Sequence, residues 1–274
     1  MQRPDVTIVI LNYNTFRLVH QCIQSTLAET QKVKMEIIVV DNGSSERDPE
    51  DLKKLYPEIT LIKSMENLGF SKGNNLGIQR ANGKYILLLN SDTLLKNDAV
   101  SICKFFLDDN PNIAVATARL EYPNGRIQHN CQRFPSVRWL LYEWLRLQKI
   151  FPSLKNKFFG SFFSYHSIAY PDWVWGTFFM FRKDLLNQLP KQKLADDFFL
   201  YEEDMQWCMD FSRLGYRIAY LPSAHVVHLM EGSGGKKNFL MKQNRKIFMR
   251  LYYSSWERGV IKILNFMLTG KYGY

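Results

Sequence analysis

The chain has 274 residues, of which 46% are hydrophobic and 23% are charged, and its net charge at pH 7 is +10. This length suffices for one large α/β domain or two small ones, and the composition is that of an ordinary globular protein. No apolar run reaches the roughly 18–20 residues of a membrane span, and no signal peptide is expected. The four widely spaced cysteines exclude a Cys-x-x-Cys site and favour buried, reduced thiols of a cytosolic protein.

The basic charge is concentrated at the end of the chain. Residues 232–274 contain nine Lys and Arg residues against one acid, Glu257, a net +8 of the total +10. The remaining residues are therefore close to neutral. A basic excess confined to one tail does not favour nucleic-acid binding, so no nucleic-acid partner is expected.

Strand-like and helical segments alternate in the first half of the chain. We expect strands at 6–11, 35–40, 59–63, 85–89 and 113–118, and helices at 18–27, 49–55, 73–81 and 99–107. This alternation predicts right-handed βαβ crossovers, and hence an α/β fold with a mostly parallel sheet flanked by helices.

The second half of the chain is less regular. The aromatic-rich, turn-broken segment 119–170 is long for a loop, so we expect a partly helical excursion that covers a site. After it we expect one strand at 172–181, a helix at 203–214, short strands near 218–221 and 225–228, and two amphipathic helices in the tail. The expected division is a domain at 1–235, with a nucleotide-binding half (1–118) and an acceptor half (119–235), and a basic helical tail at 236–274.

The strand expected at 85–89 stops at Asn90-Ser91-Asp92. Open α/β sheets hold ligands at the carboxyl ends of their strands. A carboxylate placed there beside Asn and Ser is an oxygen-ligand set suited to Mg²⁺ or Mn²⁺ held jointly with a phosphate. The alternative for any single Asn-Ser-Asp is a turn or a helix N-cap.

Two other strands end in the same way. The first stops at Asn12-Tyr13-Asn14 and the second at Asp41-Asn42-Gly43-Ser44, and in βαβ topology both ends face the same rim as Asp92. Asp41 is then placed to accept hydrogen bonds from a base edge or a ribose. An Asx-turn that closes the strand is the alternative.

A glycine-rich segment precedes the fourth strand. Gly69, Gly73 and Gly77 are expected to let the backbone approach a ligand closely, at a helix N-terminus that favours phosphate or ribose oxygens. The dinucleotide pattern Gly-x-Gly-x-x-Gly belongs after the first strand, where this chain has Asn-Tyr-Asn instead. This mismatch argues against a nicotinamide dehydrogenase.

Three acids, Glu202, Glu203 and Asp204, open the helix expected at 203–214. Such acids are often only first-turn partners of the helix dipole. Here an aromatic run precedes them, which can line a pocket and desolvate one carboxylate, raising its basicity. A single carboxylate of this kind is what general-base activation of a hydroxyl needs.

Taken together, these motifs resemble the inverting nucleotide-sugar glycosyltransferases of family 2, which have the GT-A fold, and among them the bacterial rhamnosyltransferase-like members that build cell-surface polysaccharide. The resemblance runs from about residue 5 to residue 250. The matching segments are 6–14, 38–44, 67–77, 87–93, 175–177 and 201–204, together with His228, Gly232 and Ser233.

The resemblance implies a role for each candidate residue. Asp204 would be the catalytic base with Glu203 as its acidic neighbour, and Asp92 would bind the metal, Mn²⁺ or Mg²⁺, with His228 as a further ligand. A lone His at a strand end can equally be structural. The nucleotide-binding set is Asn12, Asn14, Asp41, Asn42, Gly69, Lys72, Asn74 and Ser91, and the acceptor side is Trp175, Gly176 and Thr177.

The implied partners are a dTDP- or UDP-sugar donor and a glycan or lipid-linked glycan acceptor. A competing class, the sugar nucleotidyltransferases, needs a Gly-rich loop with a nearby Arg or Lys after the first strand, which this chain lacks. A non-catalytic basic membrane module is the other alternative. The tail either lies on an anionic membrane or packs on the domain with a solvated basic face. The protein is expected in the cytoplasm, and the first of these alternatives would place it on the inner face of the cell membrane.

Overall fold

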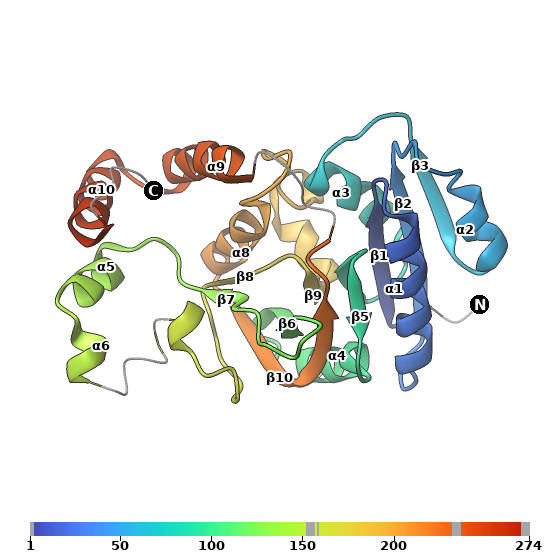
Figure 1. Cartoon of the computed structure of the whole chain (residues 1–274), viewed down its shortest axis with the longest axis horizontal. Helices are drawn as coiled ribbons and strands as arrows, with labels where there is room; N and C mark the ends of the chain where they lie inside the picture. Colours follow the sequence, from blue (N-terminus) through green and yellow to red (C-terminus); the bar gives the residue numbers. More distant parts are fainter. Residues whose placement is uncertain (1–2, 152–156, 158, 232–236, 270–274) are drawn as a thin grey trace.

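A computed structural model describes residues 3–151, 157, 159–231 and 237–269. In this part of the chain eight strands form one sheet in the order β3-β2-β1-β4-β9-β6-β10-β5 (Figure 1). Their bounds are β1 (Val6–Asn12), β2 (Met35–Asn42), β3 (Thr60–Ser64), β4 (Tyr85–Asn90), β5 (Thr93–Leu95), β6 (Ile113–Glu121), β9 (Phe178–Arg182) and β10 (Arg217–His228). A separate two-stranded sheet pairs β7 (Cys131–Gln132) with β8 (Trp173–Val174).

The large sheet is mostly parallel. Strands β3, β2, β1 and β4 pair in parallel, and β6 pairs in parallel with β10. β9 runs antiparallel between β4 and β6, and β5 runs antiparallel to β10. Six of these eight strands therefore run in the same direction, which confirms the predicted α/β class and the five strands expected in the first half.

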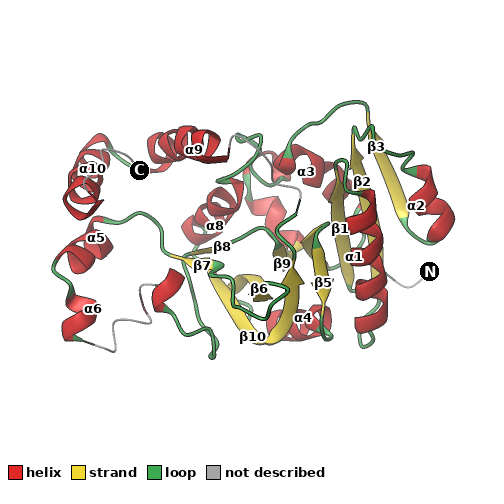
Figure 2. Cartoon of the chain, viewed as in Figure 1, coloured by secondary structure: helices red, strands yellow, loops and turns green. Residues whose placement is uncertain are grey.

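Helices cover both faces of the sheet (Figure 2). The bounds are α1 (Phe16–Glu29), α2 (Glu50–Leu55), α3 (Phe70–Arg80), α4 (Ala99–Asp109), α5 (Val137–Trp144), α6 (Leu147–Ile150), α8 (Glu203–Arg213), α9 (Lys237–Tyr252) and α10 (Ser255–Thr269), with 3₁₀ turns at Gly160–Phe162, Lys183–Gln188 and Pro190–Gln192. Side chains of α1, α2 and α4 pack in the core on one face of the sheet, and those of α3 and α8 on the other.

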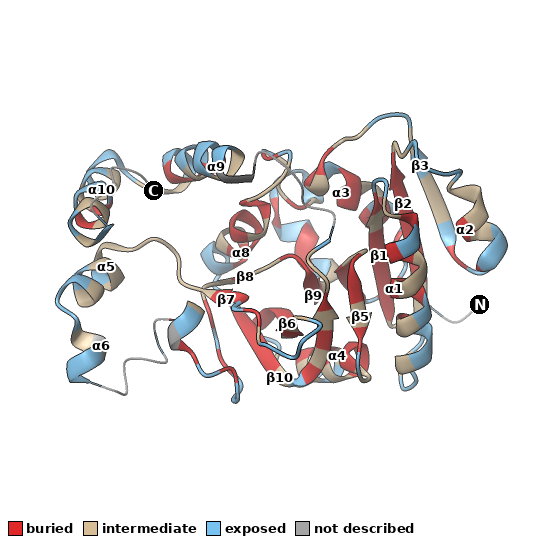
Figure 3. Ribbon diagram, in the orientation of Figure 1, coloured by how far each residue is buried: buried red, intermediate tan, exposed pale blue. Residues whose placement is uncertain are grey.

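The apolar run of β4 explains why the sheet has two cores. Successive side chains of a strand point to opposite faces. Leu87 and Leu89 join the core on the α1 and α4 side, whereas Ile86 and Leu88 join the core on the α3 and α8 side. All four are at most 2% exposed, as expected for a strand covered on both faces. Figure 3 shows that buried residues are concentrated on the strands of the sheet, for example on β1 and β5.

The structure corrects two predictions for the second half of the chain and adds one strand to the first half. The strand expected at 172–181 is split into β8 and β9, because Trp175-Gly176-Thr177 leaves the extended ladder between them. The two short strands near 218–228 are one strand, β10, with an irregularity between Leu221 and His225. Strand β5 was not predicted, since its three residues carry too little pattern to be recognised.

The helix α3 corrects the interpretation of two glycines. A Cβ at Gly73 would lie 2.5 Å from Leu11 Cδ1, and one at Gly77 would lie 2.4 Å from Val9 Cγ1. These glycines therefore allow close packing of α3 on β1 rather than the approach of a ligand. The predicted buried thiols are confirmed, because the four cysteines are all buried and free.

The tail forms the two predicted helices. The chain division expected at 235/236 and the matching residues Gly232 and Ser233 lie outside the described residues. At the left of Figure 1, α10 lies beside α5, and the two helices are in contact. The described helices are all too short or too polar to span a lipid bilayer.

Candidate active site

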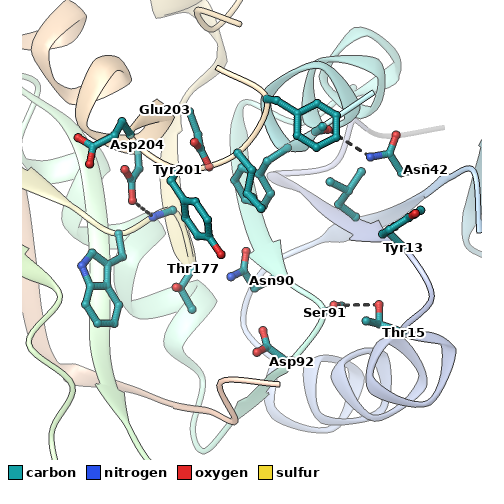
Figure 4. Close-up of a pocket in the computed structure, with 18 of the residues that line it drawn as sticks. Tyr13, Thr15, Asn42, Asn90, Ser91, Asp92, Thr177, Tyr201, Glu203 and Asp204 are labelled. Carbon is teal, nitrogen blue, oxygen red and sulfur yellow. Dashed lines mark hydrogen bonds between the residues drawn. The ribbon is translucent and has the colours of Figure 1, made fainter. Parts of the chain in front are cut away.

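One pocket lies at the carboxyl ends of β1, β2 and β4, on the rim where the sequence predicts a site (Figure 4). Its volume is about 360 Å³, which is within the range of small-molecule sites. Ten of the predicted site residues line it: Asn42, Gly69, Ser91, Asp92, Trp175, Gly176, Thr177, Glu203, Asp204 and His228. The pocket thus joins residues from both halves of the chain.

The segment 119–170 is partly helical, as expected. None of its described residues lines this pocket, so for that part of the segment the expected cover of the site is wrong. Its helix α5 packs against α10 instead. The aromatic wall comes from residues on either side of β9, among them Trp173, Trp175, Phe199 and Tyr201.

Strand β5 brings His228 to Asp92. It follows Asp92 directly and runs antiparallel to the end of β10, so that Thr93 pairs with His228. As a result His228 Nε2 lies 3.3 Å from Asp92 Oδ2, and both side chains are 8% exposed. The backbone N–H of Leu229 also donates to the carbonyl oxygen of Asp92 at 2.9 Å.

A buried amide, Gln128, fixes the His228 ring. Its Nε2 donates to the His228 carbonyl oxygen at 2.8 Å, which turns its Oε1 toward His228 Nδ1, also at 2.8 Å. An amide oxygen only accepts, so Nδ1 carries the hydrogen. In the neutral ring the lone pair of Nε2 then faces the Asp92 carboxylate.

This donor pair fits a divalent cation. Two lone pairs facing each other at 3.3 Å repel unless a proton or a cation lies between them. Mg²⁺ and Mn²⁺ bound with nucleotides take one or two protein ligands and complete their shell with phosphate oxygens. The described residues contain no group of three or more His, Cys, Asp or Glu side chains that could hold a metal by themselves. Asp92 and His228 supply two donors, the number that such a shared ion takes from the protein.

Asp204 lies in the first turn of α8, across the pocket from Asp92. Its Oδ2 accepts from the Gly176 N–H at 3.2 Å, and its Oδ1 accepts from the Met205 N–H at 2.8 Å. Burial, followed by the charge of Glu202, raises the pKa of Asp204 to about 7, against the opposing effect of the two N–H groups and Arg245. A carboxylate with this pKa can accept a proton near neutral pH.

Two buried polar groups face the space between Asp92 and Asp204. In the part of the chain that the structure describes, neither Glu203 Oε2 nor Asn90 Oδ1 has a hydrogen-bond partner. Burial, and then the charge of Asp204, raises the pKa of Glu203 well above its usual value. In Figure 4, Asn90 and Thr177 lie between the two carboxylates. Unpartnered groups on a pocket wall favour a ligand rich in hydroxyls.

The remaining predicted nucleotide-binding residues lie outside the pocket lining. Asn12 Nδ2 donates to Asp41 Oδ1 at 2.8 Å, which joins the ends of β1 and β2. Asn14 adopts a left-handed conformation (φ 55°) and accepts from two backbone N–H groups. Asn74 donates to a carbonyl oxygen of its own helix, and Lys72 is exposed. Nucleotide contacts by these five residues therefore stay a prediction.

Asn42 and Gly69 shape the loop before α3. Asn42 Nδ2 donates to Asn67 Oδ1 at 2.9 Å and to the Gly69 carbonyl oxygen at 3.2 Å. Gly69 has φ 83°, and a Cβ there would lie 2.4 Å from the Phe199 carbonyl oxygen. This glycine therefore lets the loop before α3 touch the segment that leads to Asp204.

Sequence reasoning missed several residues of the site. Gln128 gave no signal, because nothing in its neighbourhood indicates a partner 100 residues further on. Tyr13, which is 47% exposed at the pocket, and Asn90 both lay within motifs that were recognised but were not assigned a role. Met241 of α9 also lines the pocket, although the tail was expected to be a separate unit.

Curated relatives match part of the chain. A chondroitin synthase of Pasteurella multocida (strain Pm70) is 34% identical over 137 residues, 48% of this chain and 14% of that protein. The succinoglycan biosynthesis protein ExoO of Rhizobium meliloti (strain 1021) is 34% identical over 96 residues, 35% of this chain and 27% of that protein. The matches thus span less than a third of these two relatives.

Solved structures share the fold. The mannosyltransferase PcManGT from Pyrobaculum calidifontis, in complex with GDP-Man and Mn²⁺, matches with a TM-score of 0.63 and 16% identity, over 98% of this chain and 71% of that one. GalNAc-T7 with UDP, GalNAc and Mn²⁺ matches with a TM-score of 0.66 and 14% identity, over 91% of this chain and 48% of that one. At these identities the likeness establishes the GT-A fold alone. The sequence model described as "Glycosyl transferase family 2" matches residues 7–189, two thirds of the chain, and the chain therefore belongs to that family.

Proposed function

We propose that this chain is an inverting glycosyltransferase that moves a sugar from a nucleotide-sugar donor to an acceptor hydroxyl during polysaccharide synthesis. The observation that carries the proposal is the pairing of two groups in one pocket. Asp204, whose pKa lies at about 7, faces the same space as the Asp92–His228 pair. The names of the relatives, a chondroitin synthase and a succinoglycan biosynthesis protein, support a polysaccharide product.

The reaction is a single displacement. Asp204 accepts the proton of the acceptor hydroxyl while that oxygen forms a bond to the anomeric carbon of the donor. The bond from this carbon to the diphosphate breaks, and its electron pair leaves with the diphosphate. Attack opposite the leaving group inverts the anomeric centre. General-base assistance of this kind contributes ~10²–10⁴-fold to the rate.

Asp92 and His228 would hold the divalent cation, Mn²⁺ or Mg²⁺, at the diphosphate end of the pocket. When bound, the cation supplies Lewis-acid neutralisation of the departing diphosphate. The solved structures with Mn²⁺ that share this fold support its presence. Gln128 keeps the Nε2 lone pair of His228 directed at the cation site.

The donor we propose is a dTDP- or UDP-sugar, with rhamnose as the sugar on the basis of the motif resemblance. The acceptor is a glycan or a lipid-linked glycan. A solved neighbour that contains UDP supports a uridine nucleotide, whereas the other contains a GDP-sugar. The sugar is expected to lie against Asn90 and Glu203, whose Oδ1 and Oε2 atoms have no hydrogen-bond partner in the described structure.

A thermal-shift panel tests this function. The full chain is melted with UDP-, dTDP- and GDP-sugars, each with and without Mn²⁺. We expect one nucleotide class to raise Tm by roughly 5 °C at ~100 times its Kd, and only when Mn²⁺ is present. Equal Tm values throughout the panel would contradict a nucleotide-sugar enzyme. Release of pyrophosphate from a sugar phosphate and a nucleoside triphosphate would favour the nucleotidyltransferase alternative instead.

The tail has a surface suited to an anionic membrane. On α9, Lys242, Lys246 and Arg250 are exposed at four-residue spacing and thus lie on one side of the helix. Next to them Phe239, Ile247 and Leu251 are also exposed, at 71%, 36% and 50%. A helix face that mixes cations with large apolar side chains binds anionic lipid. We therefore propose that the protein works at the inner face of the cell membrane, where a lipid-linked acceptor would lie.

Vesicle co-sedimentation tests the membrane surface. The full chain is expected to bind vesicles of phosphatidylglycerol and phosphatidylcholine and not vesicles of phosphatidylcholine alone. Lys242→Glu with Lys246→Glu should weaken binding by at least ~30-fold, because each cation contributes about 1 kcal/mol near such a surface. The control is Lys32→Glu with Lys54→Glu, two exposed sites on α2 and the loop before β2. Binding that both double variants retain equally would contradict the surface.

A further inference from the structure

The segment that leads into α8 is held in an uncommon backbone conformation. Tyr201 and Glu202 have φ values of 72° and 75°, in the left-handed region that residues other than glycine rarely adopt. Two consecutive residues of this kind cost free energy and persist only where their surroundings hold them. They stand directly before Glu203 and Asp204, so the position of both carboxylates depends on them.

The surroundings that hold this segment belong to the tail helix α9. Asn244 Nδ2 donates to two successive carbonyl oxygens, those of Leu200 at 2.8 Å and Tyr201 at 2.9 Å. Arg245 donates two hydrogen bonds to the Glu202 carboxylate, from Nε to Oε2 at 2.6 Å and from Nη2 to Oε1 at 3.1 Å. The two-pronged geometry is the strong form of a charge-assisted hydrogen bond. Both donors reach residues more than 40 positions earlier in the chain.

These contacts are shielded from water. Asn244 is 5% exposed, and the Glu202 side chain is 4% exposed. Beside them lies an apolar cluster to which the base segment and the tail both contribute: Phe198, Met205, Phe248, Met249 and Ile261. A hydrogen bond in such an environment is stronger than one at the surface, and its loss leaves a buried group without a partner.

We infer that α9 is part of the catalytic unit, and that Asn244 and Arg245 are positioning residues that fix the segment 200–204 and thereby the base Asp204. The inference deepens the proposed function and rests on it for the role of Asp204. It also revises the expected division of the chain. Removing the tail would expose the cluster around Met205 and release the two left-handed residues, so a domain that ends at residue 235 would lack the support of its base.

Arg245 has an electrostatic effect on Asp204 as well. The charged groups near Asp204 are Glu202 and Glu203 on its own segment and Arg245 on α9, and the Cys208 thiol lies one turn further along α8. Glu202 raises the pKa of Asp204 and Arg245 lowers it. Without Arg245, the Glu202 charge would be unbalanced, so the pH at which Asp204 ionises should rise.

The first experiment measures the segment itself, independently of activity. Hydrogen exchange of the peptide that covers 198–206 is followed in the full chain for wild type, Asn244→Leu and Arg245→Met. We expect exchange on the order of tenfold faster in both variants, because the segment opens locally. Gln243→Leu, which alters an exposed amide next to Asn244, is the matched control and should exchange like wild type. Wild-type exchange in both variants would overturn the inference.

The second experiment measures hydrolysis of the nucleotide sugar selected by the thermal-shift panel, with water as acceptor. Arg245→Met should lower kcat on the order of 10²-fold with a nearly unchanged donor KM, and move the acidic limb of its pH profile upward. Arg245→Lys should return the acidic limb of the pH profile to its wild-type position but recover only part of kcat. Lysine supplies the positive charge but cannot form the two-nitrogen contact with Glu202. In the double variant Glu202→Gln, Arg245→Met both charges are removed. The acidic limb of its pH profile should therefore return toward the wild-type position, while kcat stays low.

The outcomes separate the two proposals. If the two variants exchange faster but the wild-type protein hydrolyses no nucleotide sugar, the positioning role stands and the proposed function is refuted. If Arg245→Met has the kcat and the pH profile of wild type, the positioning role is refuted and the proposed function stands. If Arg245→Met does not fold, as judged from its thermal melt, Asn244→Leu decides the question, because it leaves no unpaired buried charge.

Discussion

An Asp204→Asn variant should lose ~10²–10⁴-fold in kcat while its donor KM stays within about twofold of wild type. Asparagine keeps the size of the side chain and an oxygen that can accept from the Gly176 or Met205 N–H. It cannot accept the proton of an acceptor hydroxyl. Steady-state release of the nucleoside diphosphate, measured from pH 5 to pH 9, checks this expectation.

The pH profile gives the prediction a second part. Because the pKa of Asp204 is raised from 3.8 to about 7, the carboxyl group holds its proton below neutral pH. The wild-type rate should therefore rise as pH increases through 7, with only about a tenth of the protein active at pH 6. Asp204→Asn should show no such limb.

Stability provides the control for folding. Above pH 7 the wild type keeps a charge that burial disfavours, so Asp204→Asn should melt at an equal or higher temperature at pH 8. Asp210→Asn is the matched variant, because Asp210 lies on the same helix and accepts from the Tyr252 hydroxyl at 2.6 Å, outside the pocket lining. An Asp204→Asn protein with near wild-type turnover would show that another group is the base.

Asp92→Asn should abolish binding of Mn²⁺ in the presence of UDP. The change removes the charge of a side chain that lies 3.3 Å from His228 Nε2 and leaves the ring facing a neutral amide. Electron paramagnetic resonance of free Mn²⁺, titrated with the full chain and UDP, measures this directly without turnover. Gln128→Leu should weaken the same binding by roughly 10–100-fold, the usual effect of losing a residue that orients a ligand.

The two variants Asp92→Asn and Gln128→Leu together test the metal site. Gln132→Leu is the control for Gln128→Leu, because Gln132 lies close in sequence but donates to the His129 carbonyl oxygen rather than to His228. Affinity for Mn²⁺ that is unchanged in Asp92→Asn would place the cation elsewhere. Unchanged affinity in Gln128→Leu alone would leave Asp92 as a ligand and remove His228 from the site.

The sequence was sufficient for the parallel part of the sheet. Of those strands, β1, β2 and β4 each carry a run of apolar residues that ends in Asn or Asp, and the βαβ connection forces their ends to one rim. The place of Asp92 in the pocket that Figure 4 shows was expected from this rule, whereas that of Asp204 was expected from the family resemblance. Such predictions need only local sequence patterns and one rule of chain topology.

The parts that could not be predicted depend on pairing across long separations. The contact of His228 with Asp92 needs β5, three residues that pair with the end of a strand more than 130 positions later. The link from Gln128 to His228 spans 100 positions and involves a single side chain. The burial of such a side chain could not be predicted either, because an isolated Gln or Asn in a sequence is more often exposed.

The glycines illustrate how one pattern serves two purposes. Gly69, Gly73 and Gly77 have the spacing of a ligand-binding loop, yet only Gly69 reaches the pocket. The other two lie against Leu11 and Val9 of β1. Helix-on-sheet packing and ligand approach both require the absence of a Cβ, so sequence alone does not separate them.

Strand β9 runs against the direction of its neighbours β4 and β6, and just before it the N–H of Asn90 donates to the Thr177 carbonyl oxygen at 3.0 Å. That one peptide contact ties the Asp92 end of the cavity to the side where Asp204 stands, inside the sheet. The described residues between β7 and β8, in contrast, pack with Phe163 and Tyr165 in the core on the α3 and α8 side, and none of them lines the pocket. Exchanges at their exposed positions would leave the spacing of Asp92 and Asp204 as the sheet sets it.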